Sequence, residues 1–74
     1  MADNVNFAKD LILGTSSTEQ AGNLLTEMYL QFATKEISEK EVREAVKQLE
    51  DENKIIALMP ADPEFYWQTI IYPK

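Results

Sequence analysis

The feature that most constrains the fold is a helix with a marked start and end, followed at once by strand-forming residues. Ser38 and Glu41 have the spacing of a capping box, in which each side chain accepts a hydrogen bond from the other residue's backbone amide. Asn53 follows the last apolar position of the helical repeat, and asparagine tolerates the left-handed conformation that ends many helices. We therefore predict a helix over residues 39–53. Its buried face is expected to contain Val42, Ala45, Val46 and Leu49.

The C-terminal segment consists of two strand-forming runs separated by a proline-rich break. Residues 54–59 and 65–72 are rich in β-branched, aromatic and aliphatic side chains, which favour strands. Pro60 and Pro63 lie between the runs, and proline cannot donate a hydrogen bond to a strand ladder. The sequence therefore predicts an antiparallel hairpin whose connection is about five residues long, in place of a tight two-residue turn.

Two further helices are predicted in the first half of the chain. Apolar residues recur at helical spacing over residues 3–13, and Gly14 is placed to end that helix with a positive φ. Ser17 and Gln20 have capping-box spacing before a second apolar stripe, which predicts a helix over residues 18–34. The expected fold class is α+β, with three helices followed by a C-terminal two-stranded antiparallel hairpin.

The order of three helices and a hairpin resembles the winged-helix superfamily. The resemblance rests on residues 37–42 and on residues 46–55, where a helix ends in leucine, an acidic turn follows and isoleucine opens the wing. Asn53 stands where the superfamily commonly has glycine. The resemblance implies that the third helix would enter the major groove of DNA and that the wing would touch the backbone or the minor groove.

Composition limits the chemistry that such a frame can perform. A chain of 74 residues has room for a single domain, and it contains neither cysteine nor histidine. Disulfides, thiolate metal sites and histidine-based catalysis are therefore excluded. The acidic residues 50–52 lack the alternating ligand pattern of a calcium loop, and no glycine-rich loop is present to hold phosphate. We predict no enzyme activity, no cofactor, no metal site and no small-molecule substrate.

Charge and hydropathy indicate a cytoplasmic protein. The formal net charge is -6, which opposes nonspecific attraction to phosphate and to anionic lipid. No apolar run approaches the roughly 20 residues of a membrane span, and the N-terminal residues lack the basic start of a secretory signal.

Basic residues of the third helix are the candidates for nucleic-acid binding. Helical spacing places Lys40, Arg43 and Lys47 together on its exposed face, and Lys54 follows the helix. The alternative is ordinary surface pairing, because each of the four has an acidic residue four positions away. The hairpin loop is also acidic and would lie beside the phosphates of a bound duplex. A DNA-binding transcriptional regulator is therefore the second of our two functional hypotheses.

Apolar residues of the second predicted strand are the candidates for a protein interface. On a strand, Phe65 and Trp67 would share one face, while Tyr66, Ile70 and Tyr72 would share the other. A hairpin resting on helices can pack only one face against its own core. We therefore expect at least one residue to be exposed among Tyr66, Trp67, Ile70 and Tyr72. The alternative is that these residues complete the core. The leading hypothesis is a small acidic regulator or adaptor that binds another protein or forms a homodimer.

Overall fold

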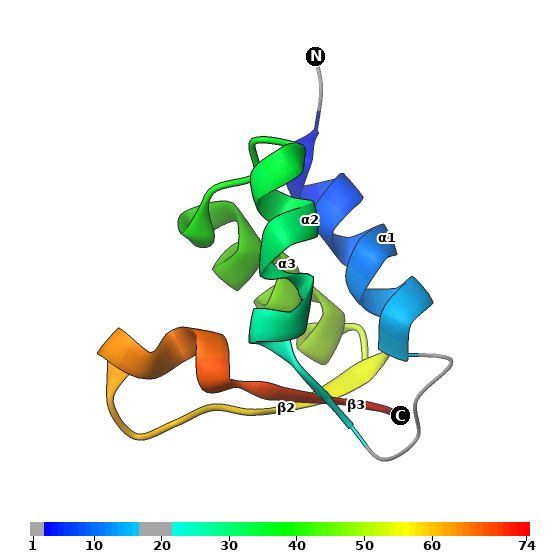
Figure 1. The fold of residues 1–74 in the computed structure, drawn as a ribbon. Coiled ribbons are helices and arrows are strands. Elements are labelled where there is room, and N and C mark those ends of the chain that lie inside the picture. Colours follow the sequence, from blue (N-terminus) through cyan, green and yellow to red (C-terminus); the bar gives the residue numbers. More distant parts are fainter. Residues whose placement is uncertain (1–2, 17–21) are drawn as a thin grey trace.

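The computed structural model describes residues 3–16 and 22–74, which form helices on one side of a small sheet (Figure 1). The sheet is antiparallel, with strand order β1-β3-β2. The α+β class is confirmed, and the arrangement of helices followed by an antiparallel hairpin is winged-helix-like. In chain order the elements are α1 (Asn4–Ser16), β1 (Asn23–Leu24), the 3₁₀ helix η1 (Leu25–Met28), α2 (Tyr29–Thr34), α3 (Glu39–Asp51), β2 (Ile55–Leu58), the 3₁₀ helix η2 (Pro63–Gln68) and β3 (Ile70–Pro73).

Helix α3 agrees closely with its prediction from local sequence. The Glu41 amide donates to the Ser38 hydroxyl at 3.3 Å, and the Ser38 amide donates to the Glu41 carboxylate at 2.9 Å, so the capping box is complete. The helix ends at Asp51, two residues earlier than predicted, and Asn53 adopts the left-handed conformation with φ of 60°. The expected buried face is confirmed: Val42, Ala45, Val46 and Leu49 are all fully buried.

Helix α1 is longer than the sequence predicted, and the assignment of Gly14 as its end was wrong. The helix continues through Gly14 to Ser16, and the glycine with a positive φ is Gly22, at 98°. A Cβ atom on Gly22 would lie 2.7 Å from Cε1 of Tyr72, so both the backbone conformation and the space favour glycine there. The predicted capping box of residues 17 and 20 lies outside the described residues.

The second predicted helix is divided, and the sequence reading missed strand β1. Residues 23 and 24 pair with β3, η1 follows, and α2 begins only at Tyr29. The Leu25 amide donates to the Thr69 carbonyl at 2.8 Å, a bond to a residue far along the chain that a helical period cannot reveal. The apolar stripe is still used, because Leu25, Met28 and Phe32 are fully buried in η1 and α2.

The predicted antiparallel hairpin is present, but its second strand begins at Ile70 and not at Phe65, so the connection is longer than the five residues predicted. The first half of the segment 65–72 belongs to η2. The Asp62 carboxylate accepts a hydrogen bond from the Glu64 amide at 3.0 Å. Pro63 occupies the first turn, where its fixed φ suits the start of a helix. This local capping outweighs the strand propensity of the aromatic residues that follow.

The hydrophobic core lies between the helices and the sheet. Phe32, Leu49 and Ile71 are among its fully buried side chains, contributed by α2, α3 and β3 respectively. Tyr66 and Ile37 are buried at its margin. The sheet therefore packs one face inward, and none of the helices in the described part of the chain covers the opposite face.

Candidate functional site

The face of the sheet that points away from the helices is apolar. Along β2, Ile56 and Leu58 point outward and are 44% and 54% exposed. Residues directly opposite each other in an antiparallel pair project to the same side of the sheet. Ile56 lies opposite Tyr72, and both Leu58 and Leu24 lie opposite Ile70. We call this surface the outer sheet face; it consists of Leu24, Ile56, Leu58, Ile70 and Tyr72.

The structure distributes the five predicted interface residues over two different environments. Ile70 and Tyr72 share the outer sheet face, as the strand alternation predicted, and both are half-buried. Phe65, Tyr66 and Trp67 lie on η2, so their predicted alternation between strand faces was wrong. Phe65 is 51% exposed and Tyr66 only 5%. Trp67 is half-buried, like Ile70 and Tyr72. None of these three residues or Tyr66 is exposed, so the expectation that at least one of the four would be exposed was also wrong.

Ile56 and Leu58 are the interface candidates that sequence reasoning missed. The run that contains them has no polar residue at alternate positions, so the sequence does not show which side chains face solvent. Only the register with β3 places these two side chains outside the core. The lack of polar alternation in an antiparallel edge strand was itself a signal that both sheet faces are apolar.

Trp67 fixes η2 to the body of the protein. Its ring meets Tyr29 edge-on with centroids 5.0 Å apart, and it lies 6.0 Å from the ring of Phe32. Tyr66 is its neighbour on η2, with centroids 6.2 Å apart. Aromatic contacts of this geometry contribute about 0.5–1.5 kcal/mol beyond the burial of area. The long hairpin connection is therefore anchored to α2.

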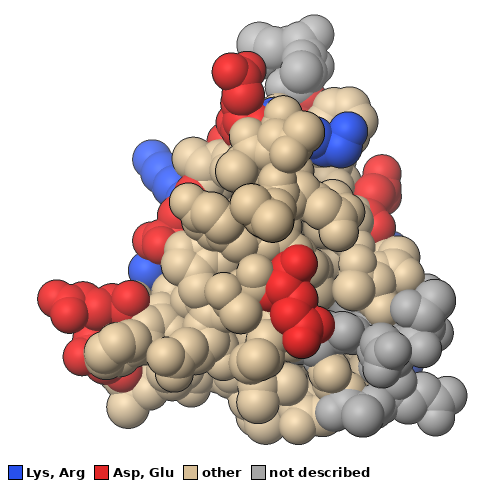
Figure 2. Space-filling view, in the orientation of Figure 1, with Lys and Arg blue, Asp and Glu red and all other residues tan. Residues whose placement is uncertain are grey.

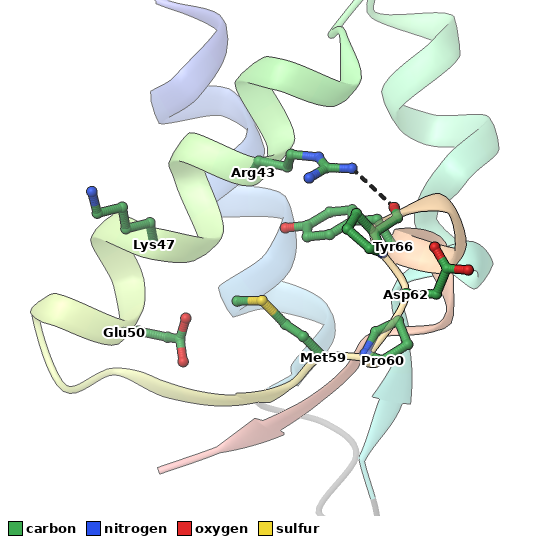
Figure 3. A pocket seen from close by; sticks show the side chains of 8 residues that line it. Arg43, Lys47, Glu50, Met59, Pro60, Asp62 and Tyr66 are labelled. Atoms are coloured by element: carbon green, nitrogen blue, oxygen red, sulfur yellow. Dashed lines mark hydrogen bonds between the residues drawn. The ribbon is translucent and has the colours of Figure 1, made fainter.

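A groove of about 330 Å³ separates α3 from the hairpin connection (Figure 3). One wall is a face of α3, and the other is formed by the chain that leaves β2 and enters η2. Figure 3 shows Met59 pointing into the space between Glu50 and Tyr66. We call this the α3 groove; its lining residues are Arg43, Lys47, Glu50, Met59, Pro60, Asp62, Pro63 and Tyr66.

Arg43 and Tyr66 are in contact with each other in the lining of this groove. The Arg43 guanidinium lies 4.3 Å from the centroid of the Tyr66 ring, donates to the Pro63 carbonyl at 3.2 Å and pairs with Glu39 at 3.0 Å. Burial raises the pKa of Tyr66 to about 12, so its hydroxyl stays protonated near neutral pH. That hydroxyl is buried and has no hydrogen-bond partner among the described residues.

The four candidate nucleic-acid residues do not form one free basic patch. Arg43 forms an ion pair with Glu39, and Lys54 forms one with Glu52 at 3.4 Å. Lys40 and Lys47 are exposed and form no ion pair with any described residue. Two of the four are thus paired, but only Arg43 with the acidic residue four positions away that was predicted; Lys54 pairs with Glu52 in place of Glu50. Figure 2 shows acidic side chains gathered at the end of the molecule that η2 and its loop form in Figure 1.

Comparisons with protein-family models, with curated proteins and with solved structures find no match. Within the described part of the chain, no helix combines the length and the hydropathy needed to cross a membrane.

Proposed function

We propose that this chain is a small winged-helix regulator or adaptor that performs no catalysis and acts by binding protein. The observation that carries the proposal is the outer sheet face, where five apolar side chains adjoin one another across three strands. Antiparallel sheets of small domains usually place polar residues on the face that lacks helices. This chain does not, although its net charge is -6.

Covering this face would release a substantial free energy. Burying one large aliphatic side chain that would otherwise be exposed contributes about 1.5–3 kcal/mol. Ile56 and Leu58 are each about half exposed in the isolated chain, so a partner gains from both. Such a surface fits an apolar patch of another polypeptide or of a second copy of this chain, and it does not fit phosphate or a lipid headgroup.

Sedimentation of labelled protein tests this proposal, alone over a range of concentrations and in an extract of the source cells. We expect the labelled chain to sediment faster than a monomer in at least one of these two conditions, and the Leu58→Lys variant to sediment as a monomer in both. Leu30→Lys is the matched control, because Leu30 is 75% exposed on α2 and lies outside the sheet. Association that survives Leu58→Lys, or a monomer in both conditions, would contradict the proposal.

Sequence-dependent DNA binding by α3 is the second candidate. It is supported by the winged-helix-like arrangement and by Lys40 and Lys47, which are exposed and form no ion pair within the part of the chain that the structure describes. Asp62 and Glu64 in the hairpin connection oppose it, since both are exposed and would approach phosphates. Titration into a labelled duplex at low salt is expected to give no submicromolar affinity. Tight binding that weakens steeply with salt and is lost in Lys47→Glu would establish this function.

A further inference from the structure

Strand β2 is an edge of the sheet, since no strand formed by residues 3–16 or 22–74 lies on its outer side. The order β1-β3-β2 places β3 in the centre, so β2 pairs on one side only. An unpaired edge exposes backbone N–H and C=O groups that another polypeptide can pair with, and proteins usually block such edges with charge or proline. Residues 55–59 contain neither.

The hydrogen-bond phase of the sheet shows which backbone groups face outward. In an antiparallel pair, successive residues turn their N–H and C=O groups to opposite neighbours. The Leu25 amide donates to the Thr69 carbonyl in register with the β1–β3 ladder. The backbone N–H and C=O groups of Ile71, two residues further on, therefore also point toward β1. Those of Ile70 and Tyr72 then point toward β2.

The same phase continues into β2 and identifies its free groups. Leu58 and Ile56 lie opposite the two β3 residues that turn toward β2, so these two residues form the ladder with β3. Ile55 and Ala57 turn their backbone groups away from β3. Extending the same phase one residue beyond the end of β2 adds Met59 to this outward-facing set. Within the described part of the chain, no other segment forms a backbone hydrogen bond with Ala57 or Met59.

The α3 groove lies beside this edge. Met59 belongs both to the outward-facing set and to the groove lining, so a chain that pairs with its backbone also passes the groove. In an added strand, alternate side chains would point toward the groove and toward the outer sheet face beside Leu58. The groove carries two basic and two acidic residues, but Met59, Pro60, Pro63 and the Tyr66 ring make much of its lining apolar.

We propose that the β2 edge and the α3 groove together bind an extended segment of a partner protein as an added strand, with an apolar side chain in the groove and a basic residue where the segment passes Asp62 and Glu64. Both of these acidic residues are exposed; Asp62 lines the groove, and Glu64 follows it two positions along the chain. A cationic side chain there would complement a chain whose net charge is -6. The inference rests on the proposed function in one respect, that this chain works by binding protein.

The Tyr66 hydroxyl gives independent support for a ligand in the groove. Tyr66 is only 5% exposed, and a buried hydroxyl that lacks a hydrogen-bond partner destabilises the free protein. In Figure 3 the hydroxyl points toward the space between α3 and the Met59 side chain, and it has almost no contact with solvent in the free protein. A hydrogen-bond acceptor on a segment that displaces the covering side chains would satisfy it. Removal of this hydroxyl should therefore stabilise the free protein and weaken the complex, two opposite effects that a purely structural role does not produce.

A displayed library of linear peptides provides the probe. Selected peptides are expected to alternate apolar and other residues, to carry a basic residue near one end and to slow amide exchange at Ala57 and Met59 when bound. N-methylation of the peptide residues that pair with β2 should reduce affinity at least tenfold, while N-methylation of the intervening residues should leave it nearly unchanged. Glutamine in place of the basic residue should weaken binding several-fold, and Tyr66→Phe should do the same while raising the melting temperature.

Failure of the library to yield any peptide that protects these amides would overturn the inference. So would equal effects of the two N-methylation patterns, or protection of the same amides by self-association, which would assign the edge to a second copy. Ala57→Pro removes an outward amide without breaking the β2–β3 ladder, and it should also abolish binding. Leu24→Lys separates the two proposals, since Leu24 is an exposed residue of the outer sheet face on β1, the strand furthest from the free β2 edge. Peptide binding should survive it.

Discussion

The two faces of the sheet have nearly the same chemistry and very different surroundings. On the inner face Ile55 and Ile71 are 2% and 0% exposed, while on the outer face Ile56 and Leu58 are 44% and 54% exposed. Propensity and hydropathy cannot distinguish these residues, because isoleucine occurs on both faces of β2. The difference shows that an apolar strand residue in this fold serves either stability or recognition, depending only on its register with β3.

The largest expected effect is on the inner face. Ile71→Ala should lower the free energy of unfolding by about 2–5 kcal/mol, because it leaves a cavity beneath the helices. Urea denaturation followed by circular dichroism would measure this change. A loss below about 1 kcal/mol would show that the inner face is loosely packed and would break the contrast between the faces.

Tyr66→Phe is expected to raise the free energy of unfolding by about 1 kcal/mol, since it removes a buried hydroxyl that has no hydrogen-bond partner in residues 3–16 and 22–74. The Arg43 guanidinium can still stack on the phenylalanine ring. Thermal melts of the two proteins would detect the shift. A clear destabilisation would mean that the hydroxyl is satisfied in the folded protein, and the groove would lose that argument for a ligand.

The third prediction concerns a substitution on the outer sheet face. Leu58→Ala should alter the free energy of unfolding by no more than about 0.5 kcal/mol, because half of the side chain is already in water. Its association should nevertheless weaken in sedimentation. Equal losses of stability from Leu58→Ala and Ile71→Ala would show that the outer face is as structural as the inner one.

The smallest effect concerns pH and leaves both faces unchanged. A hydrogen bond from Lys9 lowers the pKa of Glu52 below its ordinary value of 4.5, and the Ser38 amide lowers that of Glu41. A lowered carboxylate pKa contributes stability above pH 4.5 that is lost as the pH falls through the folded-state pKa. Melting temperature should therefore decline in acid, and Glu52→Gln should reduce that decline. An unchanged decline would remove the Lys9 contact as its cause.

Local signals explain what the sequence could predict. The Ser38 cap and the left-handed conformation of Asn53 each depend on a few neighbouring residues, so α3 could be predicted from the sequence. Strand β1 depends on pairing with β3, across more than forty positions, and no local pattern marks it. Asp62 and Pro63 did carry a helix-start signal for η2, but the aromatic residues after them were read as a strand.

The candidate site was only partly predictable for the same reason. Ile70 and Tyr72 were expected to share a face, and they do. Ile56 and Leu58 were not identified, because a run without polar alternation gives no indication of its solvent side. The α3 groove brings together residues from α3, the β2 exit and η2, and such a meeting of distant segments follows from the fold alone.

Photo-cross-linking from the outer sheet face, in the cells that make this protein, tests the central claim most directly. A photoreactive phenylalanine analogue at position 58 should give a discrete adduct, either with one partner protein or with a second copy of the chain. The same analogue at position 30, an exposed leucine on α2, should give none. No adduct from position 58, or the same adducts from both positions, would contradict the claim that the outer sheet face is an interface.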